Sequence, residues 1–409
     1  MEIKVIHHTT DLLPIEDDRE LSLAEQAIIV GGREAGICYM ADDYFSNKIN
    51  NSSSAVKRAN TIIGSGHHSP FDHYSIGFEI SGLPKIIAML LNSVGVYTTS
   101  EKSGRYTKMH PETELELEIY NKWAKKFEEI INATYNADGV KIDPKMVSKL
   151  ALENARYMLS VFTPTSMGYT VSFRQLSYMH YWAQKLISNI KNNPDPFGEK
   201  LLPYLNELDE KMFKPYSQNG IVKDKNDNGF NFFRLQNGLT PWDGQCSISD
   251  TYTVAYDCSF TCLAQAHRHR KLHYEMEFSG DYSKATCFIP PILEKYPELV
   301  DEWRSDFDKL RQYFPQCTLV HVIESGRTED FIDKCKERLC GRAQLEVVHG
   351  TMRTMELMLD NMPNFSSNLR KKFEDCSESG KVCAKCKFSG YTCTEPCIWG
   401  GKEALTRLI

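Results

Sequence analysis

The stretch that decides the fold reads Ala264-Gln-Ala-His-Arg268-His-Arg270-Lys-Leu-His-Tyr-Glu-Met-Glu-Phe-Ser279-Gly-Asp281-Tyr-Ser-Lys284. The first half of the chain carries an echo of its end, Ser103-Gly-Arg105-Tyr-Thr-Lys108. The later copy has a cationic triplet at residues 268–270, but Asp281 where the earlier copy has Arg105. The earlier copy has the uncharged residues 93–95 about where the triplet would fall. Each copy keeps what the other lacks, which predicts that both contribute to a shared site.

The segments around the two copies follow the same order. A strand of alternating polarity, at residues 74–80 and again at 250–260, precedes a short apolar helix and then the loop that holds the copy. Amphipathic helices are expected at residues 112–131 and 146–159, an aromatic-rich helix at 171–188, and further helices at 303–313 and 330–359. Turns are expected at 163–168 and 315–326. The repeated order predicts a duplication and an α+β fold.

Length and composition predict two tandem domains, residues 1–190 and 236–365. Pro, Gly and Asn are frequent in residues 191–235, which we interpret as a weakly structured linker. Residues 366–409 form a cysteine-rich tail. Each domain is expected to hold a small, mostly antiparallel sheet with long helices.

The chain has 409 residues, of which 41% are apolar and 25% charged, as in an ordinary soluble globular protein. No apolar run reaches the roughly 20 residues that cross a bilayer, and residues 1–6 lack the pattern of a secretory signal. The net charge of −6 argues against broad binding to nucleic acid or to an anionic membrane, but it allows a local cationic pocket. We therefore expect a cytoplasmic protein with a small-molecule ligand.

Thirteen cysteines are present, and several crowd into the tail. The spacing Cys383-x2-Cys386-x6-Cys393-x3-Cys397 suits a compact four-thiolate metal site, with zinc favoured over an iron–sulfur cluster. Cys376 is a spare candidate ligand. Redox-active or simply reduced thiols remain the alternative, because scattered cysteines in a chain without an export signal are usually buried thiols.

The triplet Arg268-His269-Arg270 places potential hydrogen-bond donors on consecutive residues. Guanidinium groups grip phosphate bidentately, and an imidazole donates or shuttles a proton. A short triplet of this kind is also common in a solvated surface turn, so both interpretations stay open.

The echo Ser103-Gly104-Arg105 has a similar double interpretation. A hydroxyl, a glycine that admits close approach to its N–H and an arginine form a phosphate clamp, or else a plain turn. Glu101 lies two residues earlier, where it either accepts from a base N–H or lies in solvent.

Two histidines and three arginines complete the polar candidates. His67 and His73 lie across a turn, without the spacing of a helical metal pair, and are interpreted as polar loop residues near a ligand or as structural residues. Arg156, Arg311 and Arg338 lie in expected helices, where an arginine is usually exposed or extended along the surface. The apolar neighbours of Arg338 predict a packed face around it.

Together these motifs resemble the flavin-dependent thymidylate synthases. That family has an Arg-His-Arg loop followed by spaced Ser, Asn/Glu and Ser-x-Arg-Tyr. It also has a Gly-His-x-Ser/Thr-Pro-x-x-His loop, an Ala-Arg helix and an arginine upstream of Ala-Gln-Trp-Glu. The matching residues here are Gly66–His73, Glu101 with Ser103–Tyr106, Ala155-Arg156, Arg268–Arg270, and Arg338 with Ala343-Gln-Leu345-Glu346. Leu345 replaces the family's Trp, Ser100 and Ser172 stand where the family has Asn, and the cysteine tail is outside the pattern.

The resemblance implies a set of site residues. FAD would be bound by His67, Ser69, Asp72, Arg268, His269 and Arg270. The pyrimidine nucleotide would be held by Glu101, Ser103, Gly104, Arg105, Arg156 and Arg338. Arg268, His269 and Arg105 would be the catalytic residues.

The resemblance also implies a reaction, in which a one-carbon unit passes from methylenetetrahydrofolate to C5 of dUMP. Reduced FAD would supply the hydride and NADPH would re-reduce the flavin. Members of the family form their sites between the subunits of a tetramer, so a duplicated chain implies a homodimer that acts as a pseudo-tetramer. The alternatives are methyl or hydroxymethyl transfer to a related nucleotide such as dCMP, and an inactive duplication that binds nucleotide or nucleic acid.

Overall fold

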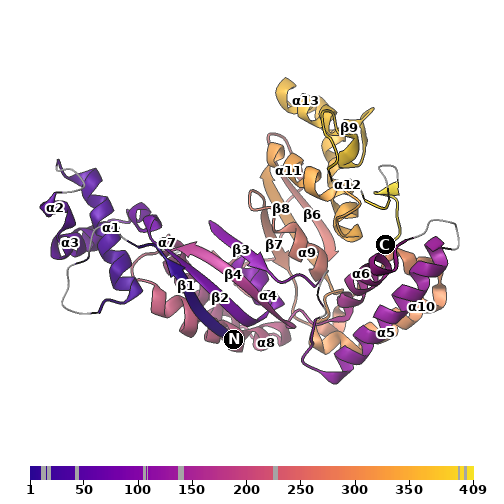
Figure 1. Ribbon diagram of the computed structural model, residues 1–409, viewed down its shortest axis with the longest axis horizontal. Helices are drawn as coiled ribbons and strands as arrows, with labels where there is room; N and C mark the ends of the chain where they lie inside the picture. Colours follow the sequence, from indigo (N-terminus) through magenta and orange to yellow (C-terminus); the bar gives the residue numbers. More distant parts are fainter. Residues whose placement is uncertain are drawn as a thin grey trace. The chain divides into compact units, whose positions relative to one another are not determined.

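The fold comes from a computed structural model, which describes residues 1–10, 15, 20–41, 46–104, 107, 109–136, 142–223, 229–394, 397–399 and 403–409. These residues form two compact units (Figure 1). The first unit comprises Met1–Lys102, Pro164–Asn231 and Gln236–Leu239, and the second comprises Ser103–Thr163, Phe232–Leu235 and Thr240–Ile409. Each unit is therefore discontinuous in sequence.

The first unit is built on a four-stranded antiparallel sheet. Its order is β1 (Glu2–His8), β2 (Ser75–Pro84), β4 (Pro164–Ser172) and β3 (Tyr97–Glu101). The predicted strand at residues 74–80 is confirmed, and its alternate side chains Ile76, Phe78 and Ile80 are fully buried.

The turn expected at residues 163–168 is wrong, because β4 runs through it between β2 and β3. Pro164 is the first residue of this strand, where a missing N–H is tolerated. Gly168 pairs with Glu79 on one side and Ser100 on the other. The cross-strand hydrogen bonds thus override the turn signal of these residues.

The first unit also contains α-helices. They are α1 (Leu23–Tyr39), α2 (Asn47–Asn50), α3 (Ser52–Gly64), α4 (Lys85–Leu91), α7 (Phe173–Asn192) and α8 (Pro196–Leu208). The expected weakly structured linker is wrong where α8 lies. Asp195 caps the Gly198 N–H at 2.8 Å, Pro196 occupies the first turn, and Phe197, Leu201 and Leu205 are fully buried. The buried face stabilises α8, although the Pro and Gly content of this segment had indicated a linker.

The second unit holds another four-stranded antiparallel sheet. Its order is β5 (Ser247–Ile248), β6 (Thr251–Ser259), β8 (Leu319–Arg327) and β7 (His273–Glu277). Taken in chain order, the four strands are arranged as in the first unit. The expected turn at 315–326 is wrong over β8, which pairs with strands on both sides. The α+β fold class is confirmed by the two sheets and their helices.

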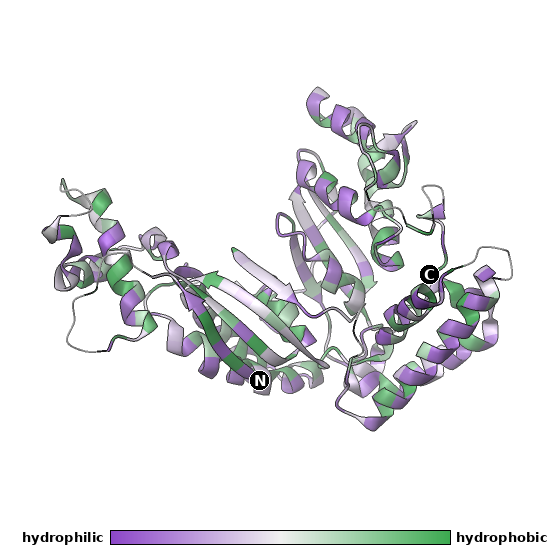
Figure 2. Cartoon of the chain, viewed as in Figure 1, coloured by the Kyte–Doolittle hydropathy of each residue, from purple (hydrophilic) through white to green (hydrophobic). Residues whose placement is uncertain are grey.

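The helices of the second unit are α5 (Glu114–Ile131), α6 (Pro144–Ala155), α9 (Phe260–Ala266), α10 (Pro297–Leu310), α11 (Thr328–Arg338), α12 (Leu345–Asp360) and α13 (Ser367–Asp375). The apolar faces of α5 and α10 meet where the Trp123 and Trp303 rings pack edge to face, 4.8 Å between centroids. Figure 2 shows hydrophobic and hydrophilic residues alternating along both helices, as expected for helices with one buried side. None of the described helices is long and apolar enough to span a membrane.

The single helix expected at residues 330–359 is wrong, because α11 ends at Arg338 and α12 begins at Leu345. The break frees backbone carbonyls, and residues far along the chain bind them. The Lys385 N–H donates to the Leu339 carbonyl at 2.7 Å, and the Arg407 guanidinium donates to the Ala343 carbonyl. The sequence around the break keeps a helical pattern, but these tail residues satisfy the backbone groups that the break exposes.

The tail follows α13 with a short hairpin, β9 (Ser377–Glu378) and β10 (Lys381–Val382). Ser379 and Gly380 at its turn have positive φ values of 53° and 71°, as a two-residue hairpin turn requires.

Candidate functional site

A connected polar network in the second unit begins at Arg156. This arginine follows the last residue of α6 and is buried, with 8% of its surface exposed, contrary to the exposed placement that is usual for helical arginines. Its Nη2 donates to Oε1 of Gln344 at 2.6 Å. A charged donor on a neutral amide forms a strong hydrogen bond, which holds the guanidinium in place.

Gln344 stands at the N-terminal end of α12 and joins two further segments to this arginine. Its Oε1 also accepts from Nε2 of Gln265, and its own Nε2 donates to the Tyr157 hydroxyl. Gln265 lies on α9, three residues before Arg268. The break between α11 and α12 therefore places an amide where α6 and α9 can both reach it.

The network continues from Gln265 to the end of α11. Arg338 donates from Nη2 to the Gln265 carbonyl at 3.1 Å and from Nε to Nε2 of His269 at 2.9 Å. An Nε2 that accepts leaves the imidazole proton on Nδ1. Burial, followed by the positive charge of Arg338, lowers the pKa of His269 to about 2. At neutral pH this histidine is therefore an uncharged acceptor rather than a proton shuttle.

Glu346 connects further segments of this hydrogen-bond network. Its fully buried carboxylate accepts from the Ser259 N–H at 2.8 Å, from the Ser259 hydroxyl and from the Tyr157 hydroxyl at 2.7 Å. Ser259 in turn caps α9, the helix that leads to the Arg-His-Arg triplet. Burial raises the pKa of Glu346, whereas these hydrogen bonds oppose that rise. The carboxylate thus joins the start of α9 to the end of α6.

The described part of the Ser103–Lys108 echo lies beside Arg156. A Cβ on Gly104 would stand 3.6 Å from Cδ of Arg156 and 3.3 Å from Cγ of Met109. Because Gly104 has no side chain, the loop can lie close to the buried side chain of Arg156. Arg105, Tyr106 and Lys108 lie outside the described residues.

The three residues of the cationic triplet differ in how deeply they are buried. Arg268 is half-buried, His269 is buried and Arg270 is exposed. The structure therefore brings His269, Arg338, Arg156 and Gly104 together with the glutamines of the network, while Arg270 lies at the surface of the second unit.

The other predicted site residues belong to the first unit. Glu101, whose side chain is 1% exposed, accepts from the Lys85 ammonium at 2.6 Å and so does not lie in solvent. Asp72 accepts from the Ser172 hydroxyl at 2.7 Å and pairs with Arg174. His67 and Ser69 are exposed in the loop that precedes β2.

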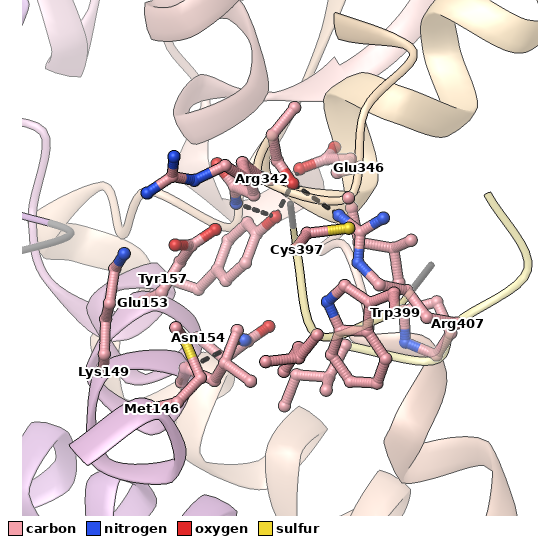
Figure 3. A pocket seen from close by; sticks show the side chains of 18 of the residues that line it. Met146, Lys149, Glu153, Asn154, Tyr157, Arg342, Glu346, Cys397, Trp399 and Arg407 are labelled. Carbon is pink, nitrogen blue, oxygen red and sulfur yellow. Dashed lines mark hydrogen bonds between the residues drawn. The ribbon is translucent and has the colours of Figure 1, made fainter. Parts of the chain in front are cut away.

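A pocket with a volume of about 100 Å³ adjoins the network in the second unit (Figure 3). Its wall is made by α6, by residues 341–346 and by the tail. The polar and aromatic lining includes Lys149, Asn154, Tyr157, Arg342, Trp399 and Arg407. Burial lowers the pKa of Arg407 to about 10, so its guanidinium stays charged at neutral pH. Ligand pockets usually measure about 300–1,000 Å³, so this pocket holds at most part of a ligand.

The structure does not gather the four predicted metal ligands in a metal-binding arrangement. Among the described residues, which include Cys383, Cys386, Cys393 and Cys397, no three His, Cys, Asp or Glu side chains are positioned to hold a metal ion. Cys383 is buried, with its Sγ 3.9 Å from the Cys376 carbonyl.

Sequence reasoning singled out Arg156 and Arg338 but missed the two glutamines that bind them and the carboxylate of Glu346. Gln265 lay inside the quoted stretch, and Gln344 and Glu346 lay inside the Ala-Gln-Leu-Glu motif. None of them was assigned a role, because a single amide or carboxylate carries little signal by itself. Tyr157 had no signal beyond its place after Arg156.

Residues 25–188 match the family model described as "Thymidylate synthase complementing protein" (Thy1). The match begins in α1 and ends in α7, and so includes Arg156 and the histidine-rich loop before β2.

Individual relatives are similar to the chain over less than its full length. The flavin-dependent thymidylate synthase of Clostridium tetani (strain Massachusetts / E88) is 23% identical over 196 residues, which cover 44% of this chain and 75% of that enzyme. Two solved structures share less sequence. Flavin-dependent thymidylate synthase ThyX from Helicobacter pylori, complexed with FAD and dUMP, is 18% identical, covers 53% of this chain and 100% of its own, and has a TM-score of 0.28. The UMP/dUMP methylase PolB from Streptomyces cacaoi, bound with 5-Br dUMP, is 16% identical, covers 44% and 76%, and has a TM-score of 0.28. Nothing about this chain's chemistry follows from TM-scores this low.

Proposed function

We propose that this chain transfers a one-carbon unit from methylenetetrahydrofolate to C5 of dUMP, with FAD as the hydride carrier. One observation carries the proposal. Arg156, Gln344, Gln265, Arg338 and His269 come from four separate stretches of sequence, and one hydrogen-bond network in the second unit joins them. The match of residues 25–188 to the Thy1 family supports the same reaction.

In this proposal the two arginines bind the anionic nucleotide. Arg156 and Arg338 are positioned by amide, carbonyl and imidazole acceptors, and Arg338 also lies 3.7 Å from the exposed carboxylate of Glu337. In this proposal the fixed guanidinium groups face a phosphate or the pyrimidine oxygens. The amides of Gln265 and Gln344 suit the donor and acceptor edge of a pyrimidine. Fixed cations and dipoles of this kind stabilise the charge that develops on the base during alkylation.

The residues present suit a flavin dinucleotide. Arg268 is half-buried and Arg270 is exposed just after α9, and guanidinium groups of this kind bind a pyrophosphate. His269 is buried against Arg338, so we assign it the role of orienting that arginine rather than of binding the flavin directly. The chemistry that bound FAD supplies is hydride transfer. His67, Ser69 and Asp72 of the first unit complete the proposed flavin set, and Glu101, Ser103, Gly104 and Arg105 complete the nucleotide set.

Duplication remains part of the proposal, and the shared strand order of the two sheets supports it. In a duplicated chain each half is free to lose part of the site. The second unit already combines residues 103–163 with residues beyond 240. NADPH and the folate are proposed because the reaction requires them. We assign none of the described residues to the binding of either molecule. The predicted domain ranges also remain predictions.

The test starts with the purified full-length chain and its visible spectrum. We expect a bound flavin, or reconstitution with added FAD, and oxidation of NADPH that requires both dUMP and methylenetetrahydrofolate. Parallel assays with dCMP and with UMP identify the nucleotide, and mass spectrometry of the product separates methyl from hydroxymethyl transfer. A chain that binds dUMP but neither takes up FAD nor turns over would instead support an inactive nucleotide-binding protein.

The split-site proposal has its own test. Arg105→Ala and Arg268→Ala should each abolish turnover, because they remove different parts of one site. Full activity in either variant would contradict a site that needs both copies of the motif.

A further inference from the structure

The pocket beside the hydrogen-bond network contains a buried amide with unused hydrogen-bonding positions. Asn154 lies on α6, two residues before Arg156, and is 9% exposed. Its Nδ2 donates to the Leu150 carbonyl at 2.9 Å, and this amide makes no second hydrogen bond in the part of the chain that the structure describes. One N–H and the oxygen Oδ1 of Asn154 are therefore open to a ligand in the pocket, which this residue lines.

The Leu150 carbonyl fixes the direction of this amide. If the amide were rotated by half a turn, Oδ1 would face the carbonyl oxygen, and two acceptors cannot form a hydrogen bond. The nitrogen of Asn154 is thus held on the side of α6. Figure 3 shows the oxygen turned toward the pocket, on the side of Trp399.

Trp399 supplies a hydrogen-bond donor from the tail. Its indole N–H has no hydrogen-bond partner within the described ranges, and Figure 3 shows the nitrogen on the pocket side of the ring. The ring is held by Tyr135, with 5.0 Å between centroids, and by the Arg407 guanidinium, 6.0 Å from the ring centroid. From Asn154 to Trp399 the pocket therefore presents a donor, an acceptor and a donor.

Aromatic rings make another wall of the pocket. Tyr157 and Phe288 pack with 5.0 Å between their centroids, and the Tyr157 hydroxyl is bound by both Gln344 and Glu346. Gln344 and Glu346 also line the pocket, so the pocket and the network belong to one site. The volume of about 100 Å³ suits one planar ring, since an engineered cavity of about 150 Å³ holds benzene.

The order of donors and acceptors distinguishes the pyrimidine bases. Uracil presents O2, N3–H and O4, which are an acceptor, a donor and an acceptor, and so complements the order found between Asn154 and Trp399. Cytosine presents O2, N3 and an amino group at C4, which are two acceptors and a donor. In this pocket N3 of cytosine would face the Asn154 oxygen, and both acceptors would lose their hydrogen bonds.

We propose that this pocket holds the pyrimidine ring and that Asn154 and Trp399 make the site specific for uracil over cytosine. The inference rests on the proposed function, which places a pyrimidine nucleotide at Arg156 and Arg338. The sugar and the phosphate lie outside the pocket, because its volume suits the ring alone. Gln344 contributes less to the choice of base, since its amide already binds Arg156, Gln265 and Tyr157.

The experiment measures the Kd values of dUMP and dCMP for the purified full-length chain by titration calorimetry. We expect the wild type to bind dUMP about 10- to 100-fold more tightly than dCMP. Asn154→Leu, which keeps a similar side-chain volume, should bring the ratio of the two Kd values close to one. A purely structural role of Asn154 would weaken both nucleotides equally and leave the ratio unchanged.

Asn361 provides the matched control. It follows α12, donates to the Leu357 carbonyl at 2.9 Å in the same way as Asn154 does to Leu150, and does not line the pocket. Asn361→Leu should therefore keep the wild-type ratio. Trp399→Phe, which retains an aromatic ring without the N–H, should raise the Kd for dUMP by about 2- to 10-fold.

A modified ligand keeps the test decisive if Asn154→Leu does not fold. dUMP that carries a methyl group on N3 lacks the central donor, so the wild type should bind it about as weakly as dCMP. Equal binding of dUMP, dCMP and the methylated nucleotide by the wild type, or an unchanged ratio in Asn154→Leu, would overturn the inference and leave the proposed reaction standing. A wild type that binds none of the three nucleotides would overturn the proposed function as well.

Discussion

His269 is a buried neutral residue in the middle of a cationic triplet. Arg338, Lys334 and His267 act on its ring electrostatically, and the exposed Glu337 lies 3.7 Å from its Nε2. The positive groups and burial both disfavour the imidazolium. His269 is thus suited to hold Arg338 in one rotamer, which an exposed histidine would not do.

This burial predicts a pH dependence of stability. The unfolded chain binds a proton at His269 near pH 6.5, whereas the folded chain does so only near pH 2, so stability is complete above pH 6.5 and falls as the pH drops below it. Between pH 6.5 and 5 the loss from this residue is ~2 kcal/mol. His269→Gln should remove that part of the slope in urea unfolding measured at pH 7 and pH 5. His321→Gln, at a partly exposed histidine beside Asp257, should keep it. Equal slopes in the wild type and in His269→Gln would contradict the buried neutral state.

Arg156 provides a test of nucleotide binding. Replacing it with glutamine removes a buried charge that the proposal places on the nucleotide, at a cost of about 1.5–3 kcal/mol. The Kd for dUMP, measured by titration calorimetry, should rise by about 10- to 100-fold. Arg304→Gln, at an exposed arginine on α10, should leave the Kd unchanged. An unchanged Kd in Arg156→Gln would remove Arg156 from the nucleotide site.

At the scale of elements, short capping contacts decide where the functional helices begin. α9 begins after its N-cap Ser259, whose N–H and hydroxyl both donate to Glu346 on α12. One carboxylate thereby sets the position of the helix that carries Gln265 and leads to Arg268. The break before α12 is required for this geometry, because a continuous helix would leave no N-terminal end at Gln344.

Glu346→Gln should therefore destabilise the protein. Glutamine offers one acceptor oxygen instead of two and turns an NH2 group toward buried donors, which leaves at least one of them without a partner. We expect a loss of ~2–4 kcal/mol in the free energy of unfolding, measured with urea. Glu356→Gln, at an exposed position of the same helix, is the matched control and should change it by less than about 0.5 kcal/mol. Similar values for both variants would mean that the carboxylate contributes little to the arrangement.

At the scale of the whole molecule, two sheets with one strand order occur in a single chain. In each unit, taken in chain order, the second and fourth strands are central and pair with each other, and a seven-residue helix follows the second strand. This agreement supports duplication more strongly than the Ser-Gly-x-Tyr pair, since topology persists after sequence identity is lost.

The proposed pseudo-tetramer predicts the size of the native particle. Two copies of a duplicated chain replace four subunits, so light scattering at micromolar concentration should give twice the chain mass of 46.9 kDa. When the light scattering is measured after size-exclusion chromatography, the flavin absorbance should elute with the dimer. A monomer that is fully active would contradict the pseudo-tetramer and leave the reaction itself untouched.

The sequence alone predicted the α+β class, several of the helices and the strands at residues 74–80 and 250–260, because these depend on local periodicity and capping residues. It also singled out Arg156, Arg338 and the Arg-His-Arg triplet, because charged residues in apolar surroundings are conspicuous. It failed at β4 and β8, where turn-forming residues are held in strands by hydrogen bonds from both sides, and at the linker, where burial stabilises α8.

Only the tertiary structure decided which residues meet. Arg156 and Gln344 are far apart in the chain, and nothing local indicates that the tail satisfies the break between α11 and α12 and so places Gln344 beside Arg156. Local patterns determine which elements form, whereas contacts between distant segments depend on burial and hydrogen bonds that exist only once those elements have packed.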